Sequence, residues 1–252
     1  MPRVYRVEID GEAQLALERD GAWSALDGDL FGDYRPGRAL DPAGRRLLAP
    51  VTPSKVVAVG LNYRDHAKEM GKALPSEPLI FLKPPSAVVG PESPIVLPPG
   101  AGRVDCEAEV GIVIGRTARN VRASEARDYV LGLTCLNDVT DRDLQKRDVQ
   151  YTRAKGFDTF APVGPAIGVG LDWGALAVGS TVNGVTRQAS STREMIFPPE
   201  QVVEFVSHVM TLLPGDVIAT GTPPGVGPIV PGDRVVVTVE GVGDLANDVV
   251  AG

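Results

Sequence analysis

The pattern of hydrophobic and polar positions in this chain favours strands over helices. Short alternating or β-branched runs recur along it, separated by glycine, proline and aspartate, which is typical of a β-rich protein. Three such runs, VYRVEI, AQLALE and AWSAL, fall within the first fifty residues and are followed by the dipeptides Asp10-Gly11, Asp20-Gly21 and Asp27-Gly28. Asp-Gly suits tight hairpin turns, so the pattern predicts a small β-domain over residues 1–50.

The rest of the chain, residues 51–252, is predicted to form one larger domain that combines strands with a few helices. Apolar runs predict strands over Lys55–Gly60, Leu79–Lys83 and Leu131–Asn137, and Asn183-Gly184 predicts a hairpin. Helical patterns cover residues 62–71, 123–130 and 199–212, the last with a clear apolar stripe.

The segment Val104–Arg116, VDCEAEVGIVIGR, is the centre of this pattern and is predicted to be a single strand. Side chains alternate along a strand, so Glu107 and Glu109 would share a face, with Cα atoms roughly 6.5–7 Å apart. A solvated strand face is one interpretation. The apolar run that follows indicates instead a strand covered on both faces, where two ionised carboxylates are costly unless cations compensate them. A metal site is therefore the favoured interpretation.

Composition and charge limit which classes of partner and which kind of metal site the chain can have. The net charge is −7 and no Lys/Arg cluster is present, which disfavours nucleic acid and anionic membranes as partners. The chain has no apolar segment of membrane-spanning length and no signal-like start, so we expect a cytoplasmic protein. Cys106 and Cys135 are expected to be reduced core thiols. Only two histidines occur, His66 and His208, so a metal would be held mainly by oxygen ligands.

Other polar residues lie at positions that are typical of catalytic or binding sites. His66 and Glu69 are at i and i+3 of a predicted helix, so the carboxylate can orient the imidazole; an ordinary surface pair is the alternative. Asp138 follows the strand that ends at Asn137. Thr222 lies in the glycine- and proline-rich loop TGTPPGVG, whose backbone can approach a ligand closely.

Six motifs in order, from about Val51 to the C-terminus, carry a family resemblance: NYRDHAKE, FLKPPSAVVGP, DCEAEVGIVIG, NDVTDRDLQ, KGFDTFAPVGP and PGDVIATGTPPGVG. Together they resemble the fumarylacetoacetate hydrolase family. The resemblance is nearest to bacterial members of the 2-hydroxyhepta-2,4-diene-1,7-dioate isomerase/5-oxopent-3-ene-1,2,5-tricarboxylate decarboxylase type. It implies an α+β fold with a rolled, β-rich core, a small N-terminal β-domain and a homodimer.

The resemblance also implies roles for individual residues. The metal, Mg²⁺ or Mn²⁺ with Ca²⁺ as a substitute in crystals, would be held by Glu107, Glu109 and Asp138. The catalytic residues would be His66, Glu69 and Lys155, with His66 as base on a mobile lid. Substrate contacts would come from Asn62, Tyr63, Arg142, Gln145 and Thr222. Asp141 departs from the family pattern, which more often has alanine there, and could alter the charge balance of the site.

The function that this resemblance implies is isomerisation or decarboxylation of 2-oxo or 2-hydroxy-dienoic dicarboxylic acids, through an enolate that the metal stabilises, in the breakdown of aromatic compounds. Three alternatives stay open: hydrolysis of a C–C bond in an acylpyruvate, decarboxylation of oxaloacetate, and metal-dependent binding of a small acid without turnover. The presence of both His66 and Glu69 favours an enzyme, because binding alone requires neither.

Overall fold

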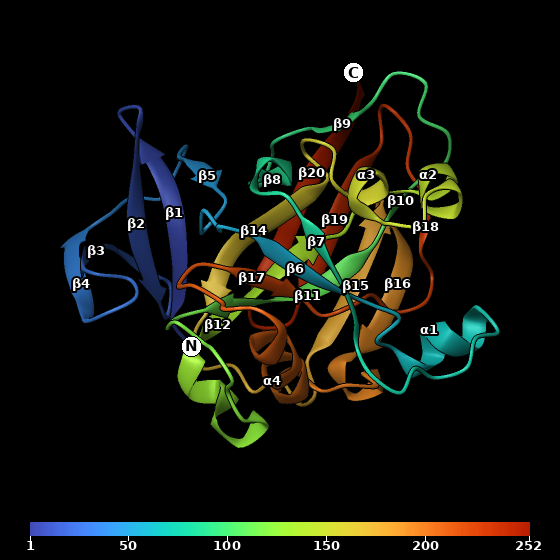
Figure 1. Ribbon diagram of the computed structural model, residues 1–252. Helices are drawn as coiled ribbons and strands as arrows, with labels where there is room; N and C mark the ends of the chain where they lie inside the picture. The colour runs from blue at the N-terminus through green and yellow to red at the C-terminus, as the bar shows by residue number, and fades with distance from the viewer.

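The computed structural model describes residues 1–252 and is built mainly of strands, with a few short helices (Figure 1). The strands form sheets of twelve, five and three members. This architecture confirms the prediction of a β-rich α+β fold. No helix is both long enough and apolar enough to cross a membrane.

The largest sheet has the order β4-β3-β2-β1-β14-β12-β11-β17-β6-β7, with β5 paired to β1 and β8 paired to β14. Its strands are β1 (Arg3–Ile9), β2 (Glu12–Arg19), β3 (Ala22–Gly28), β4 (Tyr34–Ala39), β5 (Arg46–Leu48), β6 (Val56–Gly60), β7 (Leu79–Lys83), β8 (Val88–Val89), β11 (Ala108–Ile114), β12 (Val130–Asn137), β14 (Ala161–Gly168) and β17 (Val217–Ala219).

The five-stranded sheet has the order β16-β15-β19-β20-β9, and the three-stranded sheet has the order β13-β10-β18. Their strands are β9 (Ile95–Leu97), β10 (Val104–Cys106), β13 (Thr140–Asp141), β15 (Ala177–Val182), β16 (Val185–Ser191), β18 (Gly227–Pro228), β19 (Arg234–Val239) and β20 (Gly243–Ala251). The helices are α1 (Arg64–Glu69), α2 (Arg142–Arg147), α3 (Thr152–Lys155) and α4 (Pro199–Val209), with 3₁₀ turns at Pro85–Ala87, Ala123–Tyr129 and Thr192–Glu194.

The main core lies between the two larger sheets. A cluster of 26 buried side chains joins residues of β11 and β12 to residues of β15, β19 and α4. The amphipathic stripe of α4 supplies Val202, Val203 and Val206 to this cluster. All seven residues of β11 are buried, and the strand is covered on both faces. This agrees with the apolar run, which predicted a strand covered on both faces.

The N-terminal strands extend the large sheet, since β1 pairs with β14 through Arg3 and Val4. In Figure 1 they lie on one side of the molecule (blue), with α1 (cyan) on the opposite side. Turns at Asp10-Gly11 and Asp20-Gly21 are confirmed by positive φ angles at all four residues. The turn predicted at Asp27-Gly28 is wrong, because both residues belong to β3. The chain reverses instead over residues 29–33, where Leu30 is buried in the core.

The single strand predicted over Val104–Arg116 is also wrong. The segment is divided at Glu107 into β10 and β11, which belong to different sheets. At the break, the side-chain Oδ1 of Asn137 accepts the Glu107 N–H at 3.0 Å, and the Glu107 carbonyl accepts the N–H of Asp138 at 2.9 Å. These two bonds satisfy the backbone of Glu107 where the strand is interrupted.

A buried carboxylate fixes the strands beside β11. Asp216 precedes β17 and Lys55 precedes β6, and these two strands pair in parallel. The Asp216 carboxylate accepts bonds from the N–H and hydroxyl of Ser54, the N–H and ammonium of Lys55, and the N–H of Leu213. Burial alone would raise the pKa of Asp216, but the Leu213 N–H, Lys55 and Ser54 outweigh it and hold the pKa below its ordinary value.

We predict that Asp216→Ala lowers the free energy of unfolding by about 3–5 kcal/mol, because it leaves a partly buried lysine and several N–H groups without an acceptor. Urea unfolding followed by circular dichroism measures the change. Asp248→Ala is the matched control, because Asp248 pairs with Arg234 at the surface; it should cost less than about 1 kcal/mol. Equal losses in the two variants would contradict the assignment.

The stabilisation from Asp216 should depend on pH. Because the folded-state pKa lies below the unfolded value of about 3.9, the contribution is present above about pH 4 and is lost as the pH falls through the folded value. The difference in unfolding free energy between wild type and Asp216→Ala should therefore be constant from about pH 5 to about pH 8 and shrink in more acidic solution. A difference that persists at about pH 2 would be the contrary result.

Candidate metal centre

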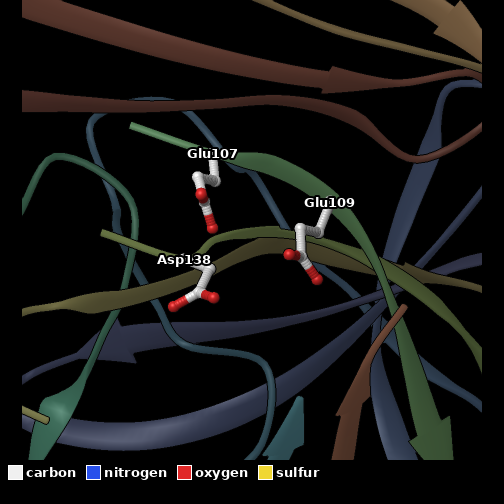
Figure 2. Close-up of side chains that lie close together, drawn as sticks. All are labelled: Glu107, Glu109 and Asp138. Atoms are coloured by element: carbon white, nitrogen blue, oxygen red, sulfur yellow. The ribbon is translucent and has the colours of Figure 1, made fainter. Parts of the chain in front are cut away.

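Three buried carboxylates meet at the ends of two neighbouring strands. Glu109 lies on β11, Glu107 lies at the break before it, and Asp138 directly follows β12. The antiparallel register places Ala108 opposite Asn137, so the three acidic residues come from one end of the strand pair. Figure 2 shows the three side chains close together, and one oxygen of each lies within 4.8 Å of the others. These are the three residues that the family resemblance implies as metal ligands.

Two lysines and an arginine surround the carboxylates. The Lys155 ammonium donates to Oε2 of Glu107 at 2.9 Å and to Oδ2 of Asp138 at 2.5 Å. Lys83 donates to Oδ1 of Asp138 at 2.5 Å, and Arg142 donates to Oε1 of Glu107 at 2.5 Å. Lys83, Lys155 and Asp138 are each at most 2% exposed. Charge-assisted bonds in such a buried setting are strong and fix the orientation of both partners.

These contacts shift the pKa values of two members in opposite directions. Burial alone would raise the pKa of Glu107, but Lys155 and Arg142 outweigh it and lower that pKa strongly. Burial, together with the charges of Asp138 and Glu107, raises the pKa of Glu109 well above its ordinary value. The difference follows from the contacts, because Glu109 has no cationic partner and accepts one hydrogen bond, from the N–H of Gly221.

The residues present fit a divalent cation. Glu109 is an almost fully buried carboxylate beside two others, and a cation at the point where all three converge would supply the compensation that it lacks. Each carboxylate offers about four lone-pair positions, so Glu107 and Asp138 retain acceptor capacity beside their bonds to lysine and arginine. An all-oxygen ligand set is typical of hard divalent ions. The site therefore supports a divalent metal held by Glu107, Glu109 and Asp138.

A histidine–glutamate pair on α1 lies on the wall of the same site. The helix begins at Arg64, and His66 Nδ1 lies 3.0 Å from Glu69 Oε2. An ionised carboxylate only accepts hydrogen bonds, so Nδ1 is the donor in this contact, and in the neutral imidazole Nε2 is then the acceptor. Glu69 also accepts the N–H of Gly225 at 3.2 Å, which joins α1 to the glycine-rich loop.

The metal ligands and the histidine open into one cavity of about 640 Å³. Its lining includes all of the predicted catalytic and metal residues and three of the predicted substrate contacts, Arg142, Gln145 and Thr222. Lys72, Arg103 and Lys146 add positive charge to the wall. The Thr222 hydroxyl already donates to the Ala108 carbonyl and accepts from Gln188, which leaves its backbone N–H as the group for an anionic oxygen.

Two predicted substrate contacts, Asn62 and Tyr63, do not line this cavity. Both are fully buried. The Asn62 amide donates to the carbonyls of Phe197 and Thr220 and accepts the N–H of Phe197, so it fixes the base of α1 to the glycine-rich loop. Tyr63 belongs to the main hydrophobic core. Their surroundings indicate a structural role for both residues.

Asp141 and Lys83 differ from what their sequence context indicated. Asp141, expected to change the charge of the site, is the N-cap of α2 and accepts the N–H groups of Asp143 and Leu144; it does not line the cavity. Lys83, the last residue of the predicted strand Leu79–Lys83, is fully buried against Asp138. The sequence signal for a buried Lys83 was its position at the end of an apolar strand before two prolines, but this signal does not specify a partner.

Comparison with known proteins agrees with this geometry. The fumarylacetoacetate (FAA) hydrolase C-terminal family matches residues 55–250. A 2-hydroxyhepta-2,4-diene-1,7-dioate isomerase from Mycobacterium marinum is similar in structure, with 45% identity, a TM-score of 0.92, and coverage of 100% of this chain and 99% of that one. A mitochondrial oxaloacetate tautomerase of Bos taurus is 44% identical over 218 residues, which are 81% of this chain and 69% of that protein.

A third similar protein bears on the metal. Maleylpyruvate hydrolase from Sphingobium sp. SYK-6, solved in complex with manganese (II) ion and pyruvate, is 32% identical with a TM-score of 0.82 and covers 99% of both chains. The family match spans most of the chain, and the acidic triad, the histidine–glutamate pair and the fold are consistent with it. The chain therefore belongs to the fumarylacetoacetate hydrolase family of enzymes.

Proposed function

We propose that the protein isomerises or decarboxylates 2-oxo or 2-hydroxy-dienoic dicarboxylic acids, with Mg²⁺ or Mn²⁺ as its metal, in the breakdown of aromatic compounds. The observation that carries this proposal is the buried carboxylate triad at the base of a cavity whose wall holds a histidine–glutamate pair. Hydrolysis of a C–C bond in an acylpyruvate is the second candidate, because it would use the same groups, with His66 taking a proton from the attacking water instead of from carbon.

The charge balance of the site supports an anionic substrate. Three carboxylates, Asp105, Glu107 and Asp138, are ion-paired with four cations, Lys83, Arg103, Arg142 and Lys155. Glu109, which would be ionised as a metal ligand, lies beside them without a cationic partner and brings the carboxylates to four. A divalent ion would thus give the site a net positive charge of about two, since the protein groups already cancel. A dicarboxylate, which carries two negative charges, restores neutrality in a buried setting where imbalance is costly.

The names of the similar proteins support the same class. Oxaloacetate, maleylpyruvate and 2-hydroxyhepta-2,4-diene-1,7-dioate are all dicarboxylates with an oxygen on the carbon next to one carboxylate. That adjacent pair of oxygens can chelate a hard cation that has open positions. A divalent ion held by the triad supplies Lewis-acid stabilisation of the negative charge that develops on such oxygens.

The remaining chemistry falls to side chains of this chain. His66 lines the cavity and its Nδ1 is held by Glu69, so Nε2 is the ring atom available to take a proton from a substrate carbon or from water and return it elsewhere. Arg142 and Gln145, bonded to each other on α2, present donors to the bound acid. Lys155 holds Glu107 and Asp138 in place and keeps a positive charge beside the reacting oxygens.

The first test concerns the metal ligands. Glu109→Gln keeps the shape of the side chain and removes its charge, so Mn²⁺ affinity measured by calorimetry should fall by more than roughly 100-fold, the upper end of what loss of an outer-shell partner costs. Glu125→Gln, at an exposed glutamate paired with Arg122, should leave the affinity unchanged. Equal Mn²⁺ affinities in the two variants would exclude Glu109 as a ligand.

The second test separates metal binding from proton transfer. His66 lies outside the triad, so His66→Ala should keep wild-type Mn²⁺ affinity while kcat falls roughly 10²–10⁴-fold, the usual contribution of a positioned acid–base group. The only other histidine, His208, is exposed on α4 and bonded to the Glu204 carbonyl, which makes His208→Ala the matched control. Near-normal kcat in His66→Ala would assign the proton transfer to a different group.

The third test decides the reaction. Purified protein with Mg²⁺ or Mn²⁺ is incubated in D₂O with oxaloacetate, an acylpyruvate and 2-hydroxyhepta-2,4-diene-1,7-dioate, and the products are followed by NMR. Isomerisation should incorporate deuterium without loss of carbon, decarboxylation should release CO₂, and hydrolysis should yield two acids. We expect one of the first two outcomes on the dicarboxylates. Metal binding without turnover of any member would leave a small-acid-binding protein, and the proposed reaction would be rejected.

A further inference from the structure

A buried amide outside the cavity lining holds the metal-binding strand from behind. Gln188 lies on β16, in the five-stranded sheet, and is 1% exposed. Its Oε1 accepts the Ala108 N–H and the Ser180 hydroxyl, both at 2.9 Å. Its Nε2 donates to the Thr222 hydroxyl and to the Pro223 carbonyl, both at 2.8 Å. A glutamine amide has two donors and two acceptor positions, so every one is used.

The Gln188 amide bonds to a part of the β11 edge that no strand covers. β17 pairs with β11 only over Gly111–Val113. Beyond this pairing, toward the start of β11, the N–H of Ala108 is bound by Gln188 and its carbonyl by the Thr222 hydroxyl at 2.9 Å. The opposite edge of β11 is occupied by β12. Two side chains therefore complete the hydrogen bonding that a longer β17 would otherwise supply.

The residue held in this way lies between two proposed metal ligands. Ala108 separates Glu107 from Glu109, so a shift of its backbone moves both carboxylates. Gln188 also holds Pro223 and Thr222, and the neighbouring Gly221 gives Glu109 its hydrogen bond. We propose that Gln188 is a positioning residue of the site, which fixes the two glutamates and the glycine-rich loop in the geometry that metal binding requires. This inference rests on the metal site of the proposed function.

A purely structural role would have a different signature. Loss of a buried amide lowers the stability of any folded protein, whether or not metal is bound. A positioning role also reduces the affinity for metal, and so reduces the extra stability that metal confers on the folded state. The two roles are distinguished by comparing metal affinity and metal-induced stabilisation with the stability of the metal-free protein.

The experiment uses Gln188→Met, which keeps the length of the side chain and removes its hydrogen bonds. The control is Asn247→Leu, because Asn247 is an equally buried amide on β20, bonded to the carbonyls of Gly90 and Ser93 away from the cavity. Both variants should melt at lower temperature in EDTA. By calorimetry, Mn²⁺ should bind Gln188→Met roughly 10- to 100-fold more weakly than wild type, as for loss of an outer-shell partner, and should bind Asn247→Leu with unchanged affinity.

Unchanged Mn²⁺ affinity in folded Gln188→Met would overturn the inference, and so would an equal loss in Asn247→Leu. Wild-type protein that binds Mn²⁺ but turns over no 2-oxo acid would reject the proposed reaction and leave the role of Gln188 in metal binding standing. If Gln188→Met fails to fold, Thr222→Val tests the same network, since it removes one hydroxyl and conserves volume. It should weaken Mn²⁺ binding several-fold, and an unchanged affinity would again overturn the inference.

Discussion

The structure depends on placing three like charges together inside the protein. Glu107, Glu109 and Asp138 are almost fully buried, and their repulsion is severe at low effective dielectric. Lys83 from β7, Arg142 from α2 and Lys155 from α3 provide the compensation, so elements far apart in the sequence must meet at this point. Glu109 alone has no cation, and that imbalance defines the place for a metal ion.

In this fold, regular strand pairing ends beside the three carboxylates. Inside the large sheet, β12 pairs with β11 as far as Ala108, but on the other edge the pairing with β17 ends at Gly111 and side chains take its place. Asn137 satisfies Glu107 on one edge, and Gln188 with Thr222 satisfies Ala108 on the other. Where the strands are interrupted, their residues lie at the cavity. The backbone groups that lose their strand partners there are hydrogen-bonded by buried amides and a hydroxyl.

Patterns in the sequence predicted features that depend on residues within one segment of the chain. Strand periodicity paired Glu107 with Glu109 and helical spacing paired His66 with Glu69, whereas Asp138 joined the ligand set through the family resemblance. The break at Glu107 could not be found this way, because the amide that bonds to the backbone there is thirty residues away. The same holds for Lys83 and Gln188, whose partners are 55 and 80 residues distant. Side chains that act across sheets leave no periodic signal in their own segments.

The site divides into a rigid base and a more weakly held wall, and this division bears on how one fold serves several reactions. The base is tied by buried charge pairs, whereas α1 is a six-residue helix that Asn62 fixes to the glycine-rich loop at its start and Glu69, whose side chain is 45% exposed, joins to that loop at its end. Short, exposed elements have low local stability and tolerate change. Similar proteins named for isomerisation, tautomerisation and hydrolysis share this fold at 32–45% identity. Because a shared fold does not by itself specify a reaction, the difference between these reactions falls to the residues that line the site.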